Sequence, residues 1–193
     1  MPADCPLPVE VHLEDEARFG LMTTKRRRIT ARGVKPVGTC QHAYANSWCY
    51  STVAPASGDR FSLLLPKLNT TNMQVFVDAF AAANPTTFNV VLLDTSAVHT
   101  TPRLKLPANV ALVFLPAYSP ELNPVERLWQ ELRGRMAWKT FVDLEGFEAE
   151  LCEQRAHYTP RVVQTLTCYP YLQRAIAEVG PWPHMSEIAE CLC

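Results

Sequence analysis

The chain has 193 residues, of which 48% are hydrophobic and 19% are charged, and its formal net charge is −1. This length and composition suit one soluble globular domain with a full core, and they exclude a protein that is basic throughout. Seven cysteines occur without a C-x-x-C pair, and the first residues do not resemble a signal peptide. We therefore expect reduced thiols in the cytoplasm and no membrane-spanning segment.

The first predicted strand ends near Asp15. Apolar and polar residues alternate over the segment Val9–Glu14, and a period of two is typical of a strand with one buried face. Glu14 and Glu16 flank Asp15. In such an acidic segment, an acidic residue at position 15 can also occur by chance, without a function. The next segment, Arg18–Lys35, is basic and contains two glycines, which predicts a long hairpin or loop.

Two more strands and a helix are predicted next. The segment Ala43–Val53 is rich in Tyr, Trp, Ser and Thr, and a turn cluster separates it from the apolar segment Phe61–Leu65. Both segments therefore suit strands. Apolar residues at helical spacing predict a helix over Thr70–Ala83, with Thr70 or Thr71 as its N-cap.

Two short apolar runs predict strands that are buried on both faces, Val90–Leu93 and Val110–Leu115. The first run leads directly to Asp94, which is either a functional carboxylate or an ordinary turn aspartate. Between the two strands, we expect a short helix over Ala97–Leu104.

A helix with a strong apolar stripe follows the last strand. Asn123 is predicted as its N-cap and Pro124 as its first helical residue. Glu126 lies three residues after Asn123, where a capping-box glutamate stands. Capping and catalysis are therefore both open as roles of Glu126.

The order of the predicted elements indicates an α/β fold. The strand–helix–strand unit implies parallel pairing with a right-handed crossover, and the early hairpins imply antiparallel pairing. We therefore expect a mixed five-stranded sheet with helices on both faces and the N-terminal strand at its centre. Two more helices are predicted over Leu144–Ala156 and Pro160–Val179, within a single domain over residues 1–180 that precedes a tail over residues 181–193.

Three carboxylates stand next to these elements, and together they suit metal-dependent phosphodiester chemistry. Asp15 and Asp94 each follow an apolar strand, and the carboxyl ends of parallel neighbours meet at one edge of a sheet. Glu126 would reach the same place from the following helix. Two divalent ions about 3.5–4 Å apart activate the attacking oxygen and stabilise the leaving oxygen in such reactions. Mg²⁺ prefers carboxylate ligands of this kind.

Basic residues gather in two places. One block is Lys25, Arg26, Arg27 and Arg28, and the other lies on the predicted helix and includes Arg127 and Arg133. Charged runs often belong to a solvated face, but their position beside the acidic residues also suits contacts with phosphate groups.

The motifs themselves resemble the DDE transposase family, in its bacterial insertion-sequence branch related to mariner-like elements. The most specific match is LPAYSPELNPVERLW, Leu115–Trp129, in which the family's catalytic glutamate corresponds to Glu126. LLDTSAVH, Leu92–His99, is similar to the strand that ends in the second catalytic aspartate, with a histidine five residues later. DEARFGL, Asp15–Leu21, is similar to the segment that begins with the first catalytic aspartate. The three motifs occur in the family's order, and the resemblance covers roughly residues 9–140.

The resemblance implies a ribonuclease-H-like fold and a metal-dependent DNA nuclease and strand transferase. It makes Asp15, Asp94 and Glu126 the catalytic residues and the ligands of Mg²⁺ or Mn²⁺, with two ions when DNA is bound. The implied partners are the DNA of the element ends and of the target, a second copy in a homodimer, and a separate helix-turn-helix polypeptide. The implied location is a bacterial cytoplasm, on DNA. We also assign His99 to nucleic-acid binding, together with the two basic groups.

Two departures from the family pattern leave other functions open. Thr95 stands where the family usually has an asparagine, and the catalytic pattern begins within fifteen residues of Met1. We therefore expect a catalytic domain without the helix-turn-helix region that reads the element ends. The alternatives are a domesticated or decayed domain that binds DNA or protein without cutting, and a ribonuclease-H-type nuclease.

Overall fold

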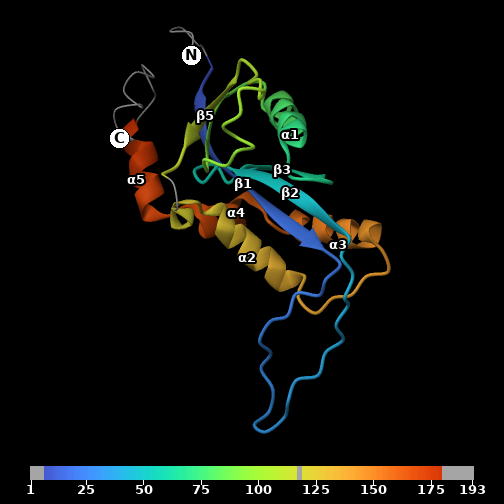
Figure 1. Ribbon diagram of the computed structural model, residues 1–193. Helices are drawn as coiled ribbons and strands as arrows, with labels where there is room; N and C mark the ends of the chain where they lie inside the picture. The colour runs from blue at the N-terminus through green and yellow to red at the C-terminus, as the bar shows by residue number, and fades with distance from the viewer. Residues whose placement is uncertain (1–6, 117–118, 180–193) are drawn as a thin grey trace.

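A five-stranded mixed sheet forms the centre of the molecule (Figure 1). The computed structural model describes residues 7–116 and 119–179, so the predicted tail lies outside the described residues. The strand order is β3-β2-β1-β4-β5, which confirms the predicted mixed sheet with the N-terminal strand at its centre. The strands are β1 (Val9–Gly20), β2 (Asn46–Val53), β3 (Arg60–Leu65), β4 (Phe88–Leu93) and β5 (Val110–Phe114).

The pairing of β1 determines where the candidate residues lie. β1 runs parallel to β4 as far as the pair Leu13–Leu92, and it runs antiparallel to β2 from Leu13 to Gly20. The strand therefore does not end near Asp15 as predicted, because its second half continues to pair with β2. Asp15 and Asp94 each lie two residues beyond the last parallel pair, so the adjacency of their strands is confirmed.

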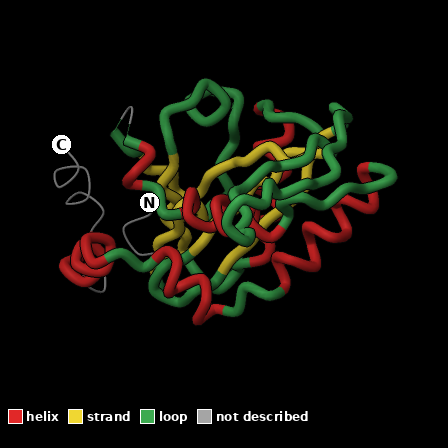
Figure 2. Tube along the Cα trace, turned by 90° about the horizontal axis from the view of Figure 1, so that it is seen from below, coloured by secondary structure: helices red, strands yellow, loops and turns green. Residues whose placement is uncertain are grey.

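Helices cover both faces of the sheet, as predicted. The helix α1 packs on one face against Tyr50, Val91 and Leu93, and α2 to α5 pack on the other face against Leu13 and Phe19. In Figure 2 the strands lie at the centre and the helices lie around them. The helices are α1 (Thr70–Ala83), α2 (Val125–Arg135), α3 (Leu144–Ala156), α4 (Pro160–Thr167) and α5 (Pro170–Val179), with a 3₁₀ turn at Pro120–Leu122 before α2.

Side chains of β1 alternate between the two faces of the sheet, and each face has its own hydrophobic core. Successive residues of a strand point to opposite faces, so Leu13, Ala17 and Phe19 join the core under α2. The alternate residues His12, Glu14 and Glu16 point toward α1, where the ring of His12 lies 4.9 Å from that of Phe80. The three acidic residues at positions 14–16 are therefore divided between the two faces.

Two predicted N-caps differ in the structure. Asn69, rather than Thr70 or Thr71, caps α1, because its side chain accepts a hydrogen bond of 2.8 Å from the N–H of Asn72. The cap position of α2 is Pro124, one residue later than predicted. The Asn123 side chain still accepts a bond of 3.1 Å from the N–H of Val125, and it donates one of 2.8 Å to the Glu14 carbonyl.

Two helix predictions were wrong, one in kind and one in extent. The segment Ala97–Leu104 forms turns instead of a helix, because the Asp94 carboxylate accepts from the Ser96 N–H and closes a turn before it. The predicted helix Pro160–Val179 is two helices, α4 and α5, which are separated at Cys168 and Tyr169. Pro170 lacks the N–H that a continuous helix needs, so a new helix begins there.

The segment between β1 and β2 extends far from the sheet as a long loop (Figure 1). Two contacts hold its base, since the Gln41 side chain bonds to both the carbonyl and the N–H of Phe141. This loop carries the first basic block. No helix in the described part of the chain combines the length and apolar character needed to cross a bilayer.

Candidate active site

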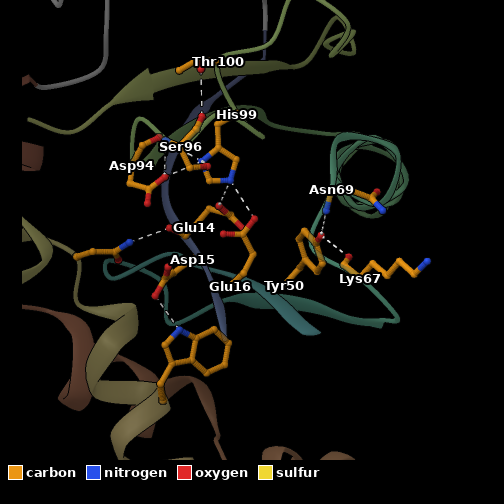
Figure 3. A network of polar contacts seen from close by, with 12 residues as sticks. Glu14, Asp15, Glu16, Tyr50, Lys67, Asn69, Asp94, Ser96, His99 and Thr100 are labelled. Atoms are coloured by element: carbon orange, nitrogen blue, oxygen red, sulfur yellow. Dashed lines mark hydrogen bonds and ion pairs between the residues drawn. The ribbon is translucent and has the colours of Figure 1, made fainter. Parts of the chain in front are cut away.

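Asp15 lies on the face of β1 that packs against α2. One of its carboxylate oxygens accepts a hydrogen bond of 2.8 Å from the indole N–H of Trp129, and Figure 3 shows this bond. Burial, the largest cause, and the charges of Glu126 and Glu16 together raise the pKa of Asp15 to about 7, against the lowering effect of the Trp129 bond. Repulsion between carboxylates therefore contributes to the raised pKa, but burial contributes more.

Asp94 lies just beyond the end of β4, with two donors on the same oxygen. Oδ1 accepts 2.9 Å from the Ser96 N–H, and it lies 2.8 Å from Nδ1 of the His99 ring. The side chain is 66% exposed. Hydrogen bonds within this turn thus hold Oδ1 in place, while the Asp94 carboxylate as a whole remains open to solvent.

Glu126 lies in the first turn of α2, partly buried, and its charge acts on Asp15. α2 has no side-chain cap hydrogen bond at its cap residue. Among the described residues, no bond joins the Glu126 carboxylate to the Asn123 N–H. The capping-box role is therefore not seen, and the carboxylate remains available beside Asp15.

A different trio has the tightest arrangement of potential metal ligands. One ligand atom from each of Glu14, Glu16 and His99 lies within 4.8 Å of the others, and among the described residues no other such group is found. Asp15, Asp94 and Glu126 do not meet this distance together. The charge of Glu126 does act on Asp15. The His99 ring bonds to Asp94 on one side and to Glu16 of β1 on the other.

His99 lies between the carboxylates of two elements (Figure 3). Its Nδ1 is 2.8 Å from Asp94 Oδ1, and its Nε2 is 2.9 Å from Glu16 Oε1 and 3.8 Å from Glu14 Oε2. Burial lowers the pKa of His99, but the bond and charge of Glu16, together with Asp94, raise it above its usual value overall. Only 3% of His99 is exposed, so it is not presented at the surface for DNA.

The predicted basic residues differ in their surroundings. All of Lys25–Arg28 is exposed. Arg26 donates to the carbonyl of Gln130, and the Arg28 guanidinium lies 4.6 Å from the centre of the Trp138 ring. On α2, Arg127 is exposed, whereas the Arg133 guanidinium lies 5.5 Å from the centre of the Phe19 ring.

Sequence reasoning missed Glu14, Glu16 and Trp129 as members of this region. In the sequence, Glu14 and Glu16 were considered only as acidic neighbours that give Asp15 a chance explanation. The period of two that predicted the strand already placed them together on the opposite face, so that signal was present. The partnership of Trp129 with Asp15 spans 114 positions, and no local pattern indicates it.

The family model of the DDE superfamily endonucleases matches residues 10–148. The chain belongs to this superfamily. A curated relative, the uncharacterized protein y4pE/y4sA of Sinorhizobium fredii (strain NBRC 101917 / NGR234), is 36% identical over 109 residues, which cover 54% of this chain and 81% of the relative.

Solved structures with a similar fold include transposases. The Mos1 transposase paired-end complex with the left transposon end matches with a TM-score of 0.64 at 17% identity, over 82% of this chain and 51% of that chain. The Mos1 mariner paired-end complex with Mn matches with a TM-score of 0.62 at 17% identity, over 82% and 52%. This DDE chain thus has the ribonuclease-H-like fold of those transposase cores, and it spans about half the length of the solved chains.

Proposed function

We propose that this chain is a transposase catalytic domain that cleaves DNA strands and transfers them in the presence of Mg²⁺ or Mn²⁺. The observation that carries the proposal is the equivalent position of Asp15 and Asp94, each two residues beyond the last parallel pair of β1 and β4. Glu126 approaches from α2, and its charge acts on Asp15. Membership of the DDE superfamily supports the same assignment of these three carboxylates.

The residues fit a divalent cation. The pKa of Asp15 is raised to about 7 by burial and by neighbouring carboxylates, and a cation would remove the cost of ionising it. Carboxylate oxygens are the ligands that Mg²⁺ and Mn²⁺ prefer. When bound, two such ions activate the attacking oxygen and stabilise the leaving oxygen of a phosphodiester.

The chain's own groups orient these ligands. Trp129 donates to one oxygen of Asp15, and Ser96 and His99 hold Oδ1 of Asp94. A bound ion would be held by the other oxygen of each aspartate. Such fixed orientation matters because a catalytic group misplaced by about 1 Å loses much of its rate advantage.

DNA is the proposed partner. One solved Mos1 complex contains the left transposon end, and we extend that kind of ligand to this chain. The exposed loop residues Lys25–Arg28 are the proposed phosphate contacts, with Arg127 as a second contact on α2. A homodimer and a separate helix-turn-helix polypeptide are the other proposed partners.

The test is metal-dependent nicking of a supercoiled plasmid by the purified chain. We expect nicking with Mn²⁺ or Mg²⁺, none with EDTA, and none by Asp94→Asn or Glu126→Gln. Glutamine can still serve a capping box, so loss of activity in Glu126→Gln separates a metal ligand from a helix cap. Glu131→Gln is the matched control, because Glu131 is an exposed residue of the same helix that pairs with Arg135 at 3.3 Å.

The other outcomes assign the alternative functions. Cleavage of RNA in a hybrid but not of plasmid DNA would indicate a ribonuclease-H-type nuclease. DNA binding without metal-dependent cleavage by the parent chain would indicate a domesticated or decayed domain. Normal nicking by Glu126→Gln would overturn the role given to the most specific motif of the chain.

A further inference from the structure

A second group of potential ligands lies on the face of β1 opposite Asp15. Glu14 and Glu16 point toward His99, whereas Asp15 points the other way to Trp129 (Figure 3). The Nε2 atom of His99 is 2.9 Å from Glu16 Oε1 and 3.8 Å from Glu14 Oε2. Two carboxylates and one imidazole are a common set of protein ligands for a divalent transition metal.

Glu14 provides an independent indication that a ligand belongs here. Its side chain has no exposed surface, and neither carboxylate oxygen has a hydrogen-bond partner among the described residues. Thr52, directly opposite Glu14 on β2, is also buried with an unpaired hydroxyl. Buried polar groups are nearly always paired, and each unpaired one costs about 1–3 kcal/mol. A bound ion would satisfy Glu14, and a water on that ion would satisfy Thr52.

The orientation of His99 fits a metal ligand. Its Nδ1 lies 2.8 Å from Asp94 Oδ1 and 3.0 Å from the Ser96 hydroxyl, which fixes the ring. Histidines that bind metals through one nitrogen usually donate the other N–H to a carboxylate or carbonyl. Asp94 fills that role, so Nε2, which faces Glu14 and Glu16, would bind the ion after losing its proton.

We propose that Glu14, Glu16 and His99 bind one divalent transition-metal ion, Mn²⁺ or Zn²⁺, on the α1 face of β1. Around a tetrahedral ion with bonds of about 2.1 Å, ligand atoms lie about 3.4 Å apart. The present separations of 2.9 Å and 3.8 Å bracket that value, so small side-chain shifts suffice. An ion with two carboxylates and a neutral imidazole forms a group without net charge, which suits a buried position.

This site is separate from the proposed catalytic site but touches it through one residue. Asp94 would hold His99 with Oδ1 while its other oxygen serves the opposite face of the sheet. The inference does not rest on the proposed function, because the ligand set and its burial stand whether or not the chain cuts DNA. An ion here would also fix the turn that carries Asp94.

The experiment uses Mn²⁺ bound to the full chain and pulsed electron paramagnetic resonance. A directly bound histidine couples its ¹⁴N nucleus to Mn²⁺, whereas a site made of Asp15, Asp94 and Glu126 has only oxygen ligands. We expect one nitrogen coupling in the parent chain. It should disappear in Glu14→Gln and in His99→Gln, and it should persist in Asp15→Asn, the adjacent residue on the other face of the strand.

Equilibrium dialysis with Mn²⁺ and Zn²⁺ gives the affinity. Asp94→Asn should weaken this site by about 10–100-fold, the usual effect of losing the carboxylate that orients a metal-bound histidine. Glu14→Gln should weaken it more, because a ligand itself is lost. Circular dichroism checks that each variant folds. If Glu14→Gln does not fold, His99→Gln replaces it as the variant that lacks a ligand.

Three results would overturn the inference. They are the absence of nitrogen coupling in the parent chain, coupling that survives in both Glu14→Gln and His99→Gln, and coupling that disappears in Asp15→Asn alone. The first result would mean that Glu14 is simply a protonated acid in the core. A chain that fails to nick DNA but shows the expected coupling pattern would leave this site intact and would reject only the proposed function.

Discussion

Replacement of Asp15 by asparagine should stabilise the metal-free protein at alkaline pH. The pKa of Asp15 is about 7 in the folded chain and 3.8 in its ordinary state. Between these two pH values the folded state holds a proton that the unfolded state releases. The stabilising contribution is therefore complete below pH 3.8 and is lost as the pH rises to about 7. Asparagine has no charge to bury, so the variant avoids that loss.

The magnitude follows from the pKa difference. The two values differ by about 3 pH units, and each unit corresponds to about 1.4 kcal/mol, which sets an upper limit of about 4 kcal/mol. Asp15 is only partly buried, so solvent screens its charge, and we expect about 2 kcal/mol. For a domain of this size, that corresponds to a change in Tm of about 4–8 °C. Asparagine can still accept the Trp129 N–H, so the packing is preserved.

The assay is urea or thermal unfolding in EDTA at pH 5 and at pH 8. The advantage of Asp15→Asn over the parent should be less than half of its full value at pH 5 and should grow to about 2 kcal/mol at pH 8. Asp78→Asn, an exposed aspartate on α1, is the matched control and should follow the parent. Equal stability of Asp15→Asn and the parent at pH 8, or lower stability of the variant, would refute the reasoning.

Two further predictions concern the surroundings of the site. Lys25 and Arg27 make no hydrogen bond, ion pair or ring contact within the described residues. Neutralising both should weaken DNA binding for all sequences and should reduce the slope of log K against log salt concentration by about 2. An unchanged slope, measured by fluorescence anisotropy, would contradict this prediction. Trp129→Phe removes the bond that lowers the pKa of Asp15, so the pH midpoint of Mn²⁺ binding should rise by about one unit; an unmoved midpoint would show that the indole does not control this carboxylate.

Most of the sheet was predictable because its signals are local. Alternation indicated the start of β1, and short apolar runs indicated β4 and β5. The predicted burial on both faces holds for β4, but it was wrong for β5, which lies at the edge of the sheet with Val110 buried and Phe114 exposed. The end of β1 was not predictable from the same pattern, because the pairing with β2 continues through the acidic residues to Gly20. The division between α4 and α5 did have a local signal, Pro170, and the helical periodicity on both sides obscured it.

The candidate site was predictable where it depends on element ends and not where it depends on distant contacts. Asp15 and Asp94 follow from their positions after apolar runs, because parallel neighbours bring such residues to one edge. The bond between His99 and Glu16 spans 83 positions, and only the fold brings these residues together. The same is true of the indole of Trp129 on Asp15. These contacts orient the candidate ligands, so they decide the chemistry although no short motif contains them.

The clustering of carboxylates around β1 makes ion binding at both proposed sites depend on pH. Burial raises the pKa of Glu14 and of Asp15, so in the metal-free molecule protonation relieves the charge as the pH falls. Divalent ions and protons therefore compete for the same oxygens, and raising the pH favours the ions. Because successive residues alternate between faces, one strand offers carboxylates to two separate cations, and Asp94 contacts the ligands of one while it serves the other. The carboxylates for which protons and divalent ions would compete are Glu14, Asp15, Glu16, Asp94 and Glu126.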